Sequence, residues 1–415
     1  MQARRCRSSM RTGDRSRAER RDSLLAYAVR IAREIQRRAV KASDGSVGWP
    51  SHPTPHLYGG TLGIAFFLAA LDHVQGPVVH RETVLRAIAP LRRTLRNLTR
   101  EPDRARSLEV PVGGLLGLGS LVYGLTRIGA WLEDPAVIRD ARSAALLMTE
   151  ERIRADERLD VHGGCAGALL ALLVLDRHLP SPGGDGRTPL ELADACGRRL
   201  VERRTRLAGS PPGWPACGEP PVSGFAHGAA GISYALLRLY ARTGRPEHRE
   251  AAADGLAFER TLYAPEADSW RDPRYGRLVA DHGWCHGAPG IALGRLGALD
   301  VHDDAETRAE LSRALAATRV LPDAELDHLC CGNLGRAEVL LQAYQALGDS
   351  ALLDDAHAIA DRVLRRAEGG GGPSLTPRGD APGFRAALFC GTAGVGYALL
   401  RLAAPSCLPT PLLLE

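Results

Sequence analysis

A Gly-x-x-Gly turn followed by an apolar run occurs seven times along this chain of 415 residues. The leading glycines are spaced 45 to 64 residues apart, and each turn continues into a stretch rich in alanine and leucine. These glycines are Gly60, Gly114, Gly164, Gly228, Gly287, Gly332 and Gly391. A repeat of this period indicates one supersecondary unit used many times, because a single unit cannot bury its apolar face alone.

Each apolar run predicts a helix. In the fourth unit Ile232, Ala235, Leu236 and Leu239 stand at i, i+3, i+4 and i+7 and therefore share one helix face. More polar helical stretches, such as residues 134–155 and 350–368, lie between the runs and carry their charge on one face. The unit is thus an apolar helix paired with an amphipathic one.

Seven such pairs predict an all-α fold. We expect an α/α toroid, a double-layered helical barrel of seven inner and seven outer helices, with the apolar helices inside. The alternative is an open solenoid, which needs polar capping repeats at both ends. The seventh unit, "FCGTAGVGYALLRLA" (389–403), is as apolar as the others, and this favours the closed ring.

The start of the chain differs from the rest. Residues 1–21 hold eight arginines against Asp14 and Glu19. We predict that residues 1–41 are a basic, poorly ordered segment leading into the first helix, and that residues 42–415 form the toroid. No aromatic residues are interleaved with these arginines to stack on bases, so no nucleic-acid partner is expected.

Two further absences bear on location. The apolar stretch 167–175 is too short to span a bilayer, and the first residues lack the apolar core of a secretory signal. We therefore expect no stable membrane insertion and a cytoplasmic protein. In that reducing compartment an odd set of nine cysteines favours metal ligands and buried thiols over disulfides.

Cysteine and histidine gather at the starts of the later inner helices. Aligned on the leading glycines, the preceding residues are Gly59, Gly113, Gly163, His227, His286, Cys331 and Cys390. The residues one step earlier are Tyr58, Val112, His162, Ala226, Cys285, Cys330 and Phe389. In a toroid these positions surround one mouth of the barrel. There Cys285, Cys330 and Cys331 could give three thiolates to one zinc ion and leave its fourth position open, as in catalytic zinc sites.

Three of the turns resemble the motifs of the lanthionine synthetase C-like cyclases: "GFAHGAAGI" (224–232), "GWCHGAPGI" (283–291) and "CCGNLG" (330–335). The resemblance runs from about residue 45 to the final "LLLE" and is strongest to the C-terminal cyclase half of the class II lanthipeptide synthetases. It implies that Cys285, Cys330 and Cys331 bind Zn²⁺. Cys331 replaces the commoner histidine, as in a Cys-Cys-Gly subgroup.

The resemblance also implies catalytic acid/base roles for His227 and for Asp160 of "LDVHGG". Asp281 stands where stand-alone members often carry an arginine, so that role is not transferred. The implied reaction is Michael-type addition of a peptide cysteine thiol to dehydroalanine or dehydrobutyrine, which forms lanthionine or methyllanthionine rings. Zinc would deprotonate the thiol, and His227 would move protons with Asp160 as its partner.

The implied partners follow from this reaction. The substrate would be a dehydrated lanthipeptide precursor. The chain has no glycine-rich phosphate loop or kinase-like motif set, so a separate or fused dehydratase would prepare that precursor. With Cys331 as a third thiolate, Zn²⁺ carries a formal charge of −1, and −2 with a bound substrate thiolate. We expect a more nucleophilic and less discriminating site than one with histidine at this position.

Other interpretations stay open from sequence alone. A zinc- and thiol-binding adaptor of the same family, with a glutathione-type ligand and no cyclase activity, is one alternative. An α/α-barrel glycosidase is another, but it would need two carboxylates at the mouth, where this chain places thiols and imidazoles. Asp160 could instead be a helix N-cap. Cys390 shares the register of Cys331 but lacks a partner cysteine, because Phe389 precedes it.

Overall fold

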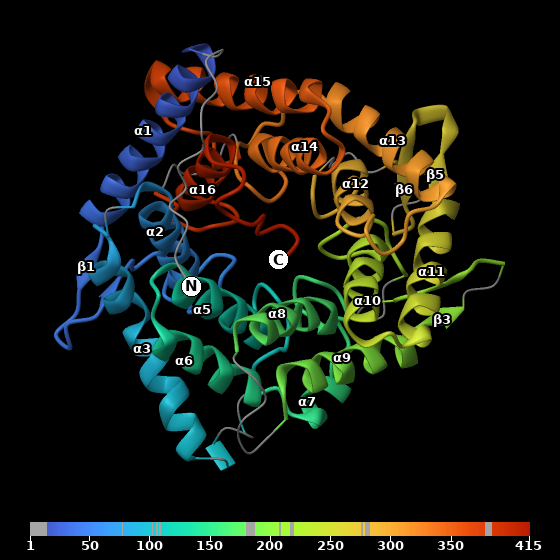
Figure 1. The fold of residues 1–415 in the computed structure, drawn as a ribbon, viewed down its shortest axis with the longest axis horizontal. Coiled ribbons are helices and arrows are strands. Elements are labelled where there is room, and N and C mark those ends of the chain that lie inside the picture. Colours follow the sequence, from blue (N-terminus) through green and yellow to red (C-terminus); the bar gives the residue numbers. More distant parts are fainter. Residues whose placement is uncertain are drawn as a thin grey trace.

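Two concentric rings of helices surround a common axis in the computed structural model (Figure 1). It describes residues 15–76, 78–101, 103–104, 107, 109–179, 187–206, 209–215, 220–274, 277–278, 283–377 and 384–415. The regular secondary structure is mostly helical, and the predicted all-α toroid is confirmed.

The inner ring is a closed circle of seven apolar helices. Each inner helix packs against the next one, and α16 packs against α2 to close the ring. The inner helices are α2 (Thr61–Gln75), α5 (Leu118–Trp131), α8 (Cys165–His178), α10 (Ala229–Thr243), α12 (Ala288–Leu296), α14 (Asn333–Leu347) and α16 (Thr392–Ala403).

The outer ring supplies one partner to each inner helix. Six outer helices directly follow their inner partners in the chain: α3 (Arg81–Arg100), α6 (Pro135–Leu146), α9 (Pro189–Arg203), α11 (Pro246–Thr261), α13 (Ala305–Val320) and α15 (Ser350–Arg366). The seventh outer place, beside α16, is filled by α1 (Arg15–Arg37) from the other end of the chain. This helix lies within residues 1–41, which were predicted to be a basic, poorly ordered segment leading into the first helix. Its buried face includes Leu24, Ala28, Ala32 and Ile35.

Sequence chemistry at the helix starts separates the two rings. Four of the outer helices begin at side chains that accept a hydrogen bond from the first turn, such as Asp134, Thr188 and Asp349. Inner helices begin at glycine N-caps, which have no side chain of their own to cap the helix. At Gly164 an added Cβ would lie 2.3 Å from the Leu159 nitrogen, so glycine allows the turn to fold tightly against the helix.

The second turn departs from the predicted register. The N-cap of α5 is Gly117 and not Gly114. Leu115 donates its backbone N–H to the His162 oxygen (3.1 Å) and accepts a hydrogen bond from the Tyr58 nitrogen (3.2 Å). Leu115 and Leu116 therefore occupy the mouth positions assigned above to Val112 and Gly113, and that part of the alignment was wrong. The triplet of closely spaced glycines at 113, 114 and 117 made the two registers indistinguishable by pattern.

Backbone hydrogen bonds connect neighbouring turns at this mouth. Besides the pairs at Leu115, they run from His162 N to Ala226 O (3.0 Å), from Cys330 N to Phe389 O (3.0 Å), and from Phe389 N to Tyr58 O (3.0 Å). Because these bonds tie a turn to its neighbour, side chains at equivalent positions of the bonded turns are held close together around the rim.

The C-terminal segment of the chain fills part of the barrel interior. The C-terminal end lies near the centre of the ring in Figure 1, and Leu412, Leu413 and Leu414 are buried. The indole nitrogen of Trp284 donates to the Leu412 oxygen (3.1 Å). Trp284 precedes Cys285, so the C-terminal segment packs directly beneath the residues of the mouth.

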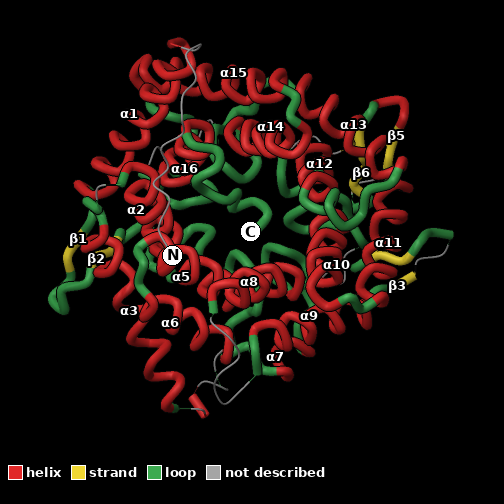
Figure 2. Tube along the Cα trace, in the orientation of Figure 1, coloured by secondary structure: helices red, strands yellow, loops and turns green. Residues whose placement is uncertain are grey.

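Short antiparallel ladders lie outside the rings (Figure 2). They are β1 (Val40–Lys41) with β2 (Val47–Gly48), β3 (Thr205–Arg206) with β4 (Pro212–Gly213), and the sheet of β5 (Tyr263–Ala264), β6 (Ser269–Asp272) and β7 (Arg277–Leu278). The remaining short elements are α7 (Glu150–Arg154), a 3₁₀ turn (Pro265–Ala267) and a π turn (Ala367–Gly371). None of the described helices has the length and apolar character needed to cross a membrane.

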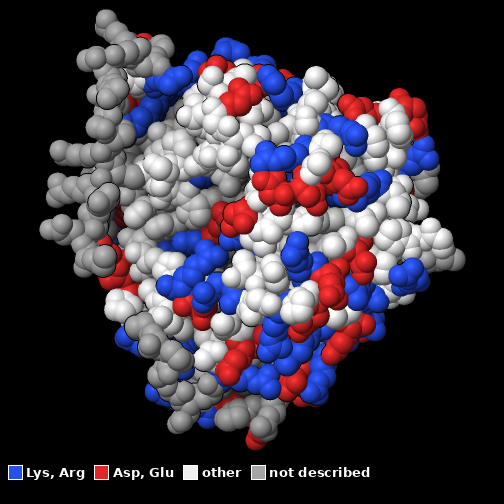
Figure 3. All heavy atoms as spheres, turned by 45° about the vertical axis from the view of Figure 1, so that its right-hand side comes forward, with Lys and Arg blue, Asp and Glu red and all other residues white. Residues whose placement is uncertain are grey.

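Acidic and basic side chains are interspersed on the outer surface. Figure 3 shows both signs side by side over the described part of the face it presents. Ion pairs between neighbouring outer helices contribute to this pattern, for example Arg319 of α13 with Asp355 of α15 (2.6 Å). The fields of opposite charges this close together largely cancel at a distance, so the electrostatic potential of this face has no single dominant sign.

Candidate metal centre and acid–base pair

The three predicted cysteines meet at the mouth of the barrel. The sulfurs of Cys285, Cys330 and Cys331 all lie within 4.8 Å of one another. Cys285 Sγ is 3.1 Å from Cys330 Sγ, and Cys330 Sγ is 3.5 Å from Cys331 Sγ. Cys330 is buried, whereas Cys285 and Cys331 are partly exposed. The cluster is therefore anchored on its inner side and accessible on its outer side.

Two glycines allow the turns to approach this cluster closely. At Gly283 a Cβ would lie 2.5 Å from the Cys331 Cβ. Gly224 has φ of +98°, and a Cβ there would lie 2.5 Å from the Cys285 oxygen. Any larger residue at either position would push a cysteine-bearing turn outward, because a Cβ does not approach a non-bonded atom this closely.

The charge of the cluster indicates what it can hold. Contacts with Cys285 and Cys330 lower the pKa of the Cys331 thiol well below its usual range. The same kind of contact with Cys285 and Cys331 raises the pKa of Cys330. One sulfur thus loses its proton readily while a neighbour keeps its own, because adjacent negative charges repel. Three thiolates at this spacing need a cation between them, and soft sulfur donors suit zinc.

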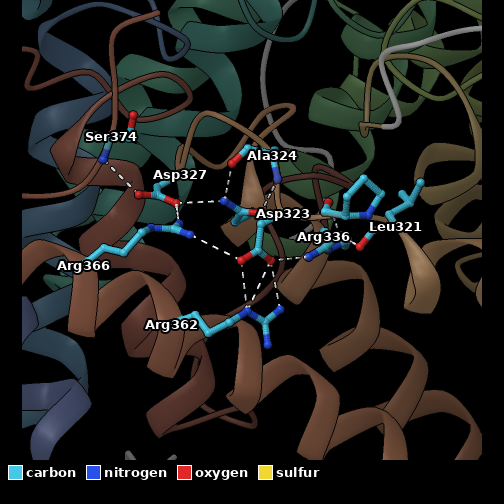
Figure 4. A network of polar contacts seen from close by, with 10 residues as sticks. Leu321, Asp323, Ala324, Asp327, Arg336, Arg362, Arg366 and Ser374 are labelled. Atoms are coloured by element: carbon cyan, nitrogen blue, oxygen red, sulfur yellow. Dashed lines mark hydrogen bonds and ion pairs between the residues drawn. The ribbon is translucent and has the colours of Figure 1, made fainter. Parts of the chain in front are cut away.

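A polar network fixes the turn that carries Cys330 and Cys331 (Figure 4). Asp327 is fully buried and accepts hydrogen bonds from the Asn333 amide (2.9 Å) and the Ser374 backbone nitrogen (2.9 Å), and it also pairs with Arg366. Asp323 binds Arg336, Arg362 and Arg366 of α14 and α15. The cysteine pair lies in the chain between Asp327 and Asn333. The network therefore holds both ends of this turn against the helices.

Asp160 and His227 form the second predicted group. The Nδ1 of His227 lies 2.8 Å from the Asp160 Oδ2. The other oxygen of Asp160 accepts the backbone N–H of Gly163 at 2.7 Å, which fixes the carboxylate within its own turn. The Asp160 side chain is 10% exposed and that of His227 is 34% exposed. A buried carboxylate thus orients an imidazole that is accessible at the mouth.

Aromatic rings connect the two groups around the rim. His227 stacks on His286 with 5.3 Å between ring centroids, and His286 directly follows Cys285 in the chain. On its other side His227 lies 4.9 Å from His162, which in turn contacts Tyr58 edge to face at 4.9 Å. Burial lowers the pKa of His162 to about 4 and also lowers that of His286. Both rings are therefore neutral near pH 7.

Sequence reasoning gave no role to Tyr58 or His162. The Tyr58 hydroxyl donates to the Cys330 sulfur (3.4 Å) and accepts from the Cys390 thiol (3.0 Å). The available signal was the register: Tyr58 and His162 occupy in the first and third turns the position that Cys330 occupies in the sixth. Cys390 lies outside the metal-binding group, although it contacts this tyrosine.

The cysteines outside this mouth were expected to be thiols and not disulfides. Cys165 and Cys196 are buried free thiols, as expected, whereas Cys407 is disulfide-bonded, so the expectation of free thiols fails there. Cysteines are small apolar residues when buried, which accounts for the first two. Asp281, whose role was left undefined, lies outside the described residues.

Comparisons with known proteins identify the family of this chain and its fold. The model of the family "Lanthionine synthetase C-like protein" matches residues 53–413. Among solved structures, a nisin cyclase is 15% identical and covers 92% of this chain and 93% of its own, with a TM-score of 0.62. A GH76 α-mannanase from Bacteroides thetaiotaomicron (10% identity, 93% and 96% coverage) reaches a TM-score of 0.48. The cyclase likeness shows that the toroid is shared.

Proposed function

Because this chain belongs to the lanthionine synthetase C-like family, we propose that it is a zinc-dependent cyclase that closes thioether rings in a peptide. It adds peptide cysteine thiols to dehydroalanine or dehydrobutyrine and yields lanthionine or methyllanthionine. The observation that carries the proposal is the cluster of Cys285, Cys330 and Cys331, three soft donors within 4.8 Å at an accessible mouth. Its resemblance to the Cys-Cys-Gly subgroup favours the class II type of cyclase.

The metal centre would be held by the three cysteines. When bound there, zinc supplies the acidity that turns a coordinated substrate thiol into a thiolate near neutral pH. Cys330 is buried in the protein, whereas Cys285 and Cys331 are partly exposed. The polar network around Asp327 keeps the sixth turn rigid, and such outer partners set how well a ligand turn holds its metal.

His227 would move the protons. The Asp160 carboxyl group accepts the Nδ1–H of His227, which leaves Nε2 as the ring nitrogen for proton exchange. In the reaction the S–H bond and the π bond between the α- and β-carbons of the dehydro residue break, while a C–S bond forms at the β-carbon and a C–H bond forms at the α-carbon. His227 Nε2 can take the thiol proton and return one to the α-carbon. The product has the same mass as the substrate, because addition only relocates a hydrogen.

The partners follow from the chemistry. The substrate is a precursor peptide that already contains dehydrated serine or threonine and a free cysteine. A dehydratase, separate or fused, must supply it. The neutral His162 and His286 beside His227 give the mouth hydrogen-bonding groups without fixed charge, which suits a peptide backbone.

The proposal is tested by incubating the zinc-loaded protein with one dehydrated peptide. We expect alkylatable thiol to disappear while the peptide mass stays constant, with Cys285→Ala as the inactive control. A protein that binds the peptide or glutathione tightly but leaves the thiol free would instead be an adaptor. That outcome would refute the cyclase proposal.

A further inference from the structure

On the premise that the three cysteines hold zinc as proposed above, we propose that Tyr58 is a positioning residue of the metal centre. Its phenol donates a hydrogen bond to the Cys330 thiolate and so offsets part of the excess negative charge of a three-sulfur site. Tyr58 belongs to the first turn, whereas its acceptor belongs to the sixth.

The orientation of the phenol is fixed by several contacts. The ring stacks on Phe389 with centroids 5.1 Å apart and an interplanar angle of 15°. His162 meets it edge to face at 4.9 Å. The Tyr58 backbone is bonded on both sides, to Leu115 and to Phe389. Because the Tyr58 ring is already ordered by these contacts, its hydroxyl stays on Cys330, and metal binding costs no further side-chain conformational entropy at this residue.

The hydrogen bonds are directional. The Cys390 thiol donates to the Tyr58 oxygen at 3.0 Å, and the Tyr58 O–H donates to Cys330 Sγ at 3.4 Å. When Cys330 binds the metal as a thiolate it is a charged acceptor, so the phenol hydrogen is directed toward Cys330. The chain of donors thus ends on the most buried sulfur of the cluster.

The electrostatic need for a donor follows from the ligand set. Three thiolates leave Zn²⁺ with a formal charge of −1, and Cys330 is 3% exposed, so water cannot solvate its sulfur well. A buried charge without a partner is costly, and a hydrogen bond to a charged acceptor is stronger than one between neutral groups. Tyr58 supplies that bond from outside the cysteine cluster.

Cobalt(II) reports on this bond without any need for turnover. The full chain is loaded with Co²⁺ in place of zinc, and both the sulfur-to-cobalt charge-transfer band and the Co²⁺ dissociation constant are measured. In Tyr58→Phe we expect the band to move to longer wavelength, because a sulfur without its donor gives up electrons more easily. The dissociation constant should rise on the order of tenfold, as for other outer partners of metal ligands.

Two further variants sharpen the test. Cys390→Ala should keep one cobalt per chain and shift the band in the same direction by less. Tyr263→Phe removes a phenol hydroxyl that bonds Asp268 on the peripheral β5 strand, and it should leave band and affinity unchanged. If Tyr58→Phe also leaves both unchanged while the parent protein shows the thiolate band, Tyr58 only packs and our inference is wrong. If the parent protein shows no thiolate band, the zinc site proposed above is wrong as well.

Discussion

The fifth and sixth turns of the barrel differ from the third and fourth in the chemistry of their side chains, although all four share one position in the fold. All four begin an inner helix at a glycine N-cap and lie on the same mouth. The fifth and sixth carry the thiols of Cys285, Cys330 and Cys331, whereas the third and fourth carry Asp160 and His227. One turn design, varied at a few positions, therefore supplies metal ligands on one part of the rim and proton-transfer groups on another.

The comparison separates two ways of losing activity. A change in the thiol turns should remove metal and catalysis together. A change in the acid–base turns should leave the metal in place and slow the reaction. The free energy of unfolding should change least in either kind of variant. The cysteines and the Asp160–His227 pair both lie at the rim, while the packed interior lies between the helices.

The largest expected effect is in Cys330→Ala. It removes the buried sulfur around which the other two are arranged, so zinc affinity should fall by more than the roughly 10- to 100-fold that loss of an outer partner costs. Ring closure should become undetectable. Metal analysis of the purified protein, together with thiol titration of a dehydrated peptide, measures both. The matched control is Cys390→Ala, which should keep its zinc. A metal-free Cys330→Ala protein with full activity would refute the zinc mechanism.

His227→Ala should keep its zinc and its fold but close rings more slowly. Loss of general acid–base help typically costs on the order of 10² to 10⁴ in rate. Zinc content and the kinetics of thioether formation should be measured on the same preparation. A zinc-free His227→Ala protein would mean that this histidine is a ligand and that the division between the two pairs of turns is wrong.

Cys331→His probes the thiol turns more gently. It should retain zinc, because imidazole is also a good zinc ligand, while the formal charge of the site rises from −1 to zero. A less negative site holds the substrate sulfur more firmly, so ring closure should slow several-fold and fewer ring patterns should form. Kinetics and fragmentation mass spectrometry of the product measure these effects. An unchanged rate and ring pattern would contradict the role given to the third thiolate.

The smallest effect concerns His162 and appears in stability. Burial lowers its pKa from the usual 6.5 to about 4, so the unfolded chain binds this proton more tightly than the folded one. The folded protein therefore loses stability as pH falls from about 6.5 to about 4. His162→Gln should reduce that loss by roughly 1 to 2 kcal/mol at about pH 4.5. Urea unfolding of both metal-free proteins at pH 7 and at pH 4.5 measures the difference. Equal losses in the two proteins would show that His162 is not the titrating group.

The sequence predicted the closed double ring because each of the seven turns is followed by an apolar stretch that predicts a helix. It also predicted which cysteines would meet, because a shared register places equivalent side chains on one rim. It failed at the second turn, where three nearby glycines permit two registers and only the backbone bonds of Leu115 distinguish them. The shared register placed Tyr58 and Cys330 on the same rim, but it did not predict their contact, because 272 residues separate them. Such a contact depends on how the ring closes.

The position of α1 has a consequence for folding during synthesis on the ribosome. The last outer position is filled by the first described helix, so α1 cannot pack in its final place until α16 has been synthesised. Helix α1 ends at Arg37, and α16 begins at Thr392. At about 5 to 20 residues per second the ribosome needs roughly 20 to 70 s to make the intervening chain. Throughout that time the apolar face of α1, including Leu24 and Ile35, has no partner from α16 to cover it. An open solenoid can fold repeat by repeat as it emerges, whereas this ring can be completed only after its final helix has left the exit tunnel.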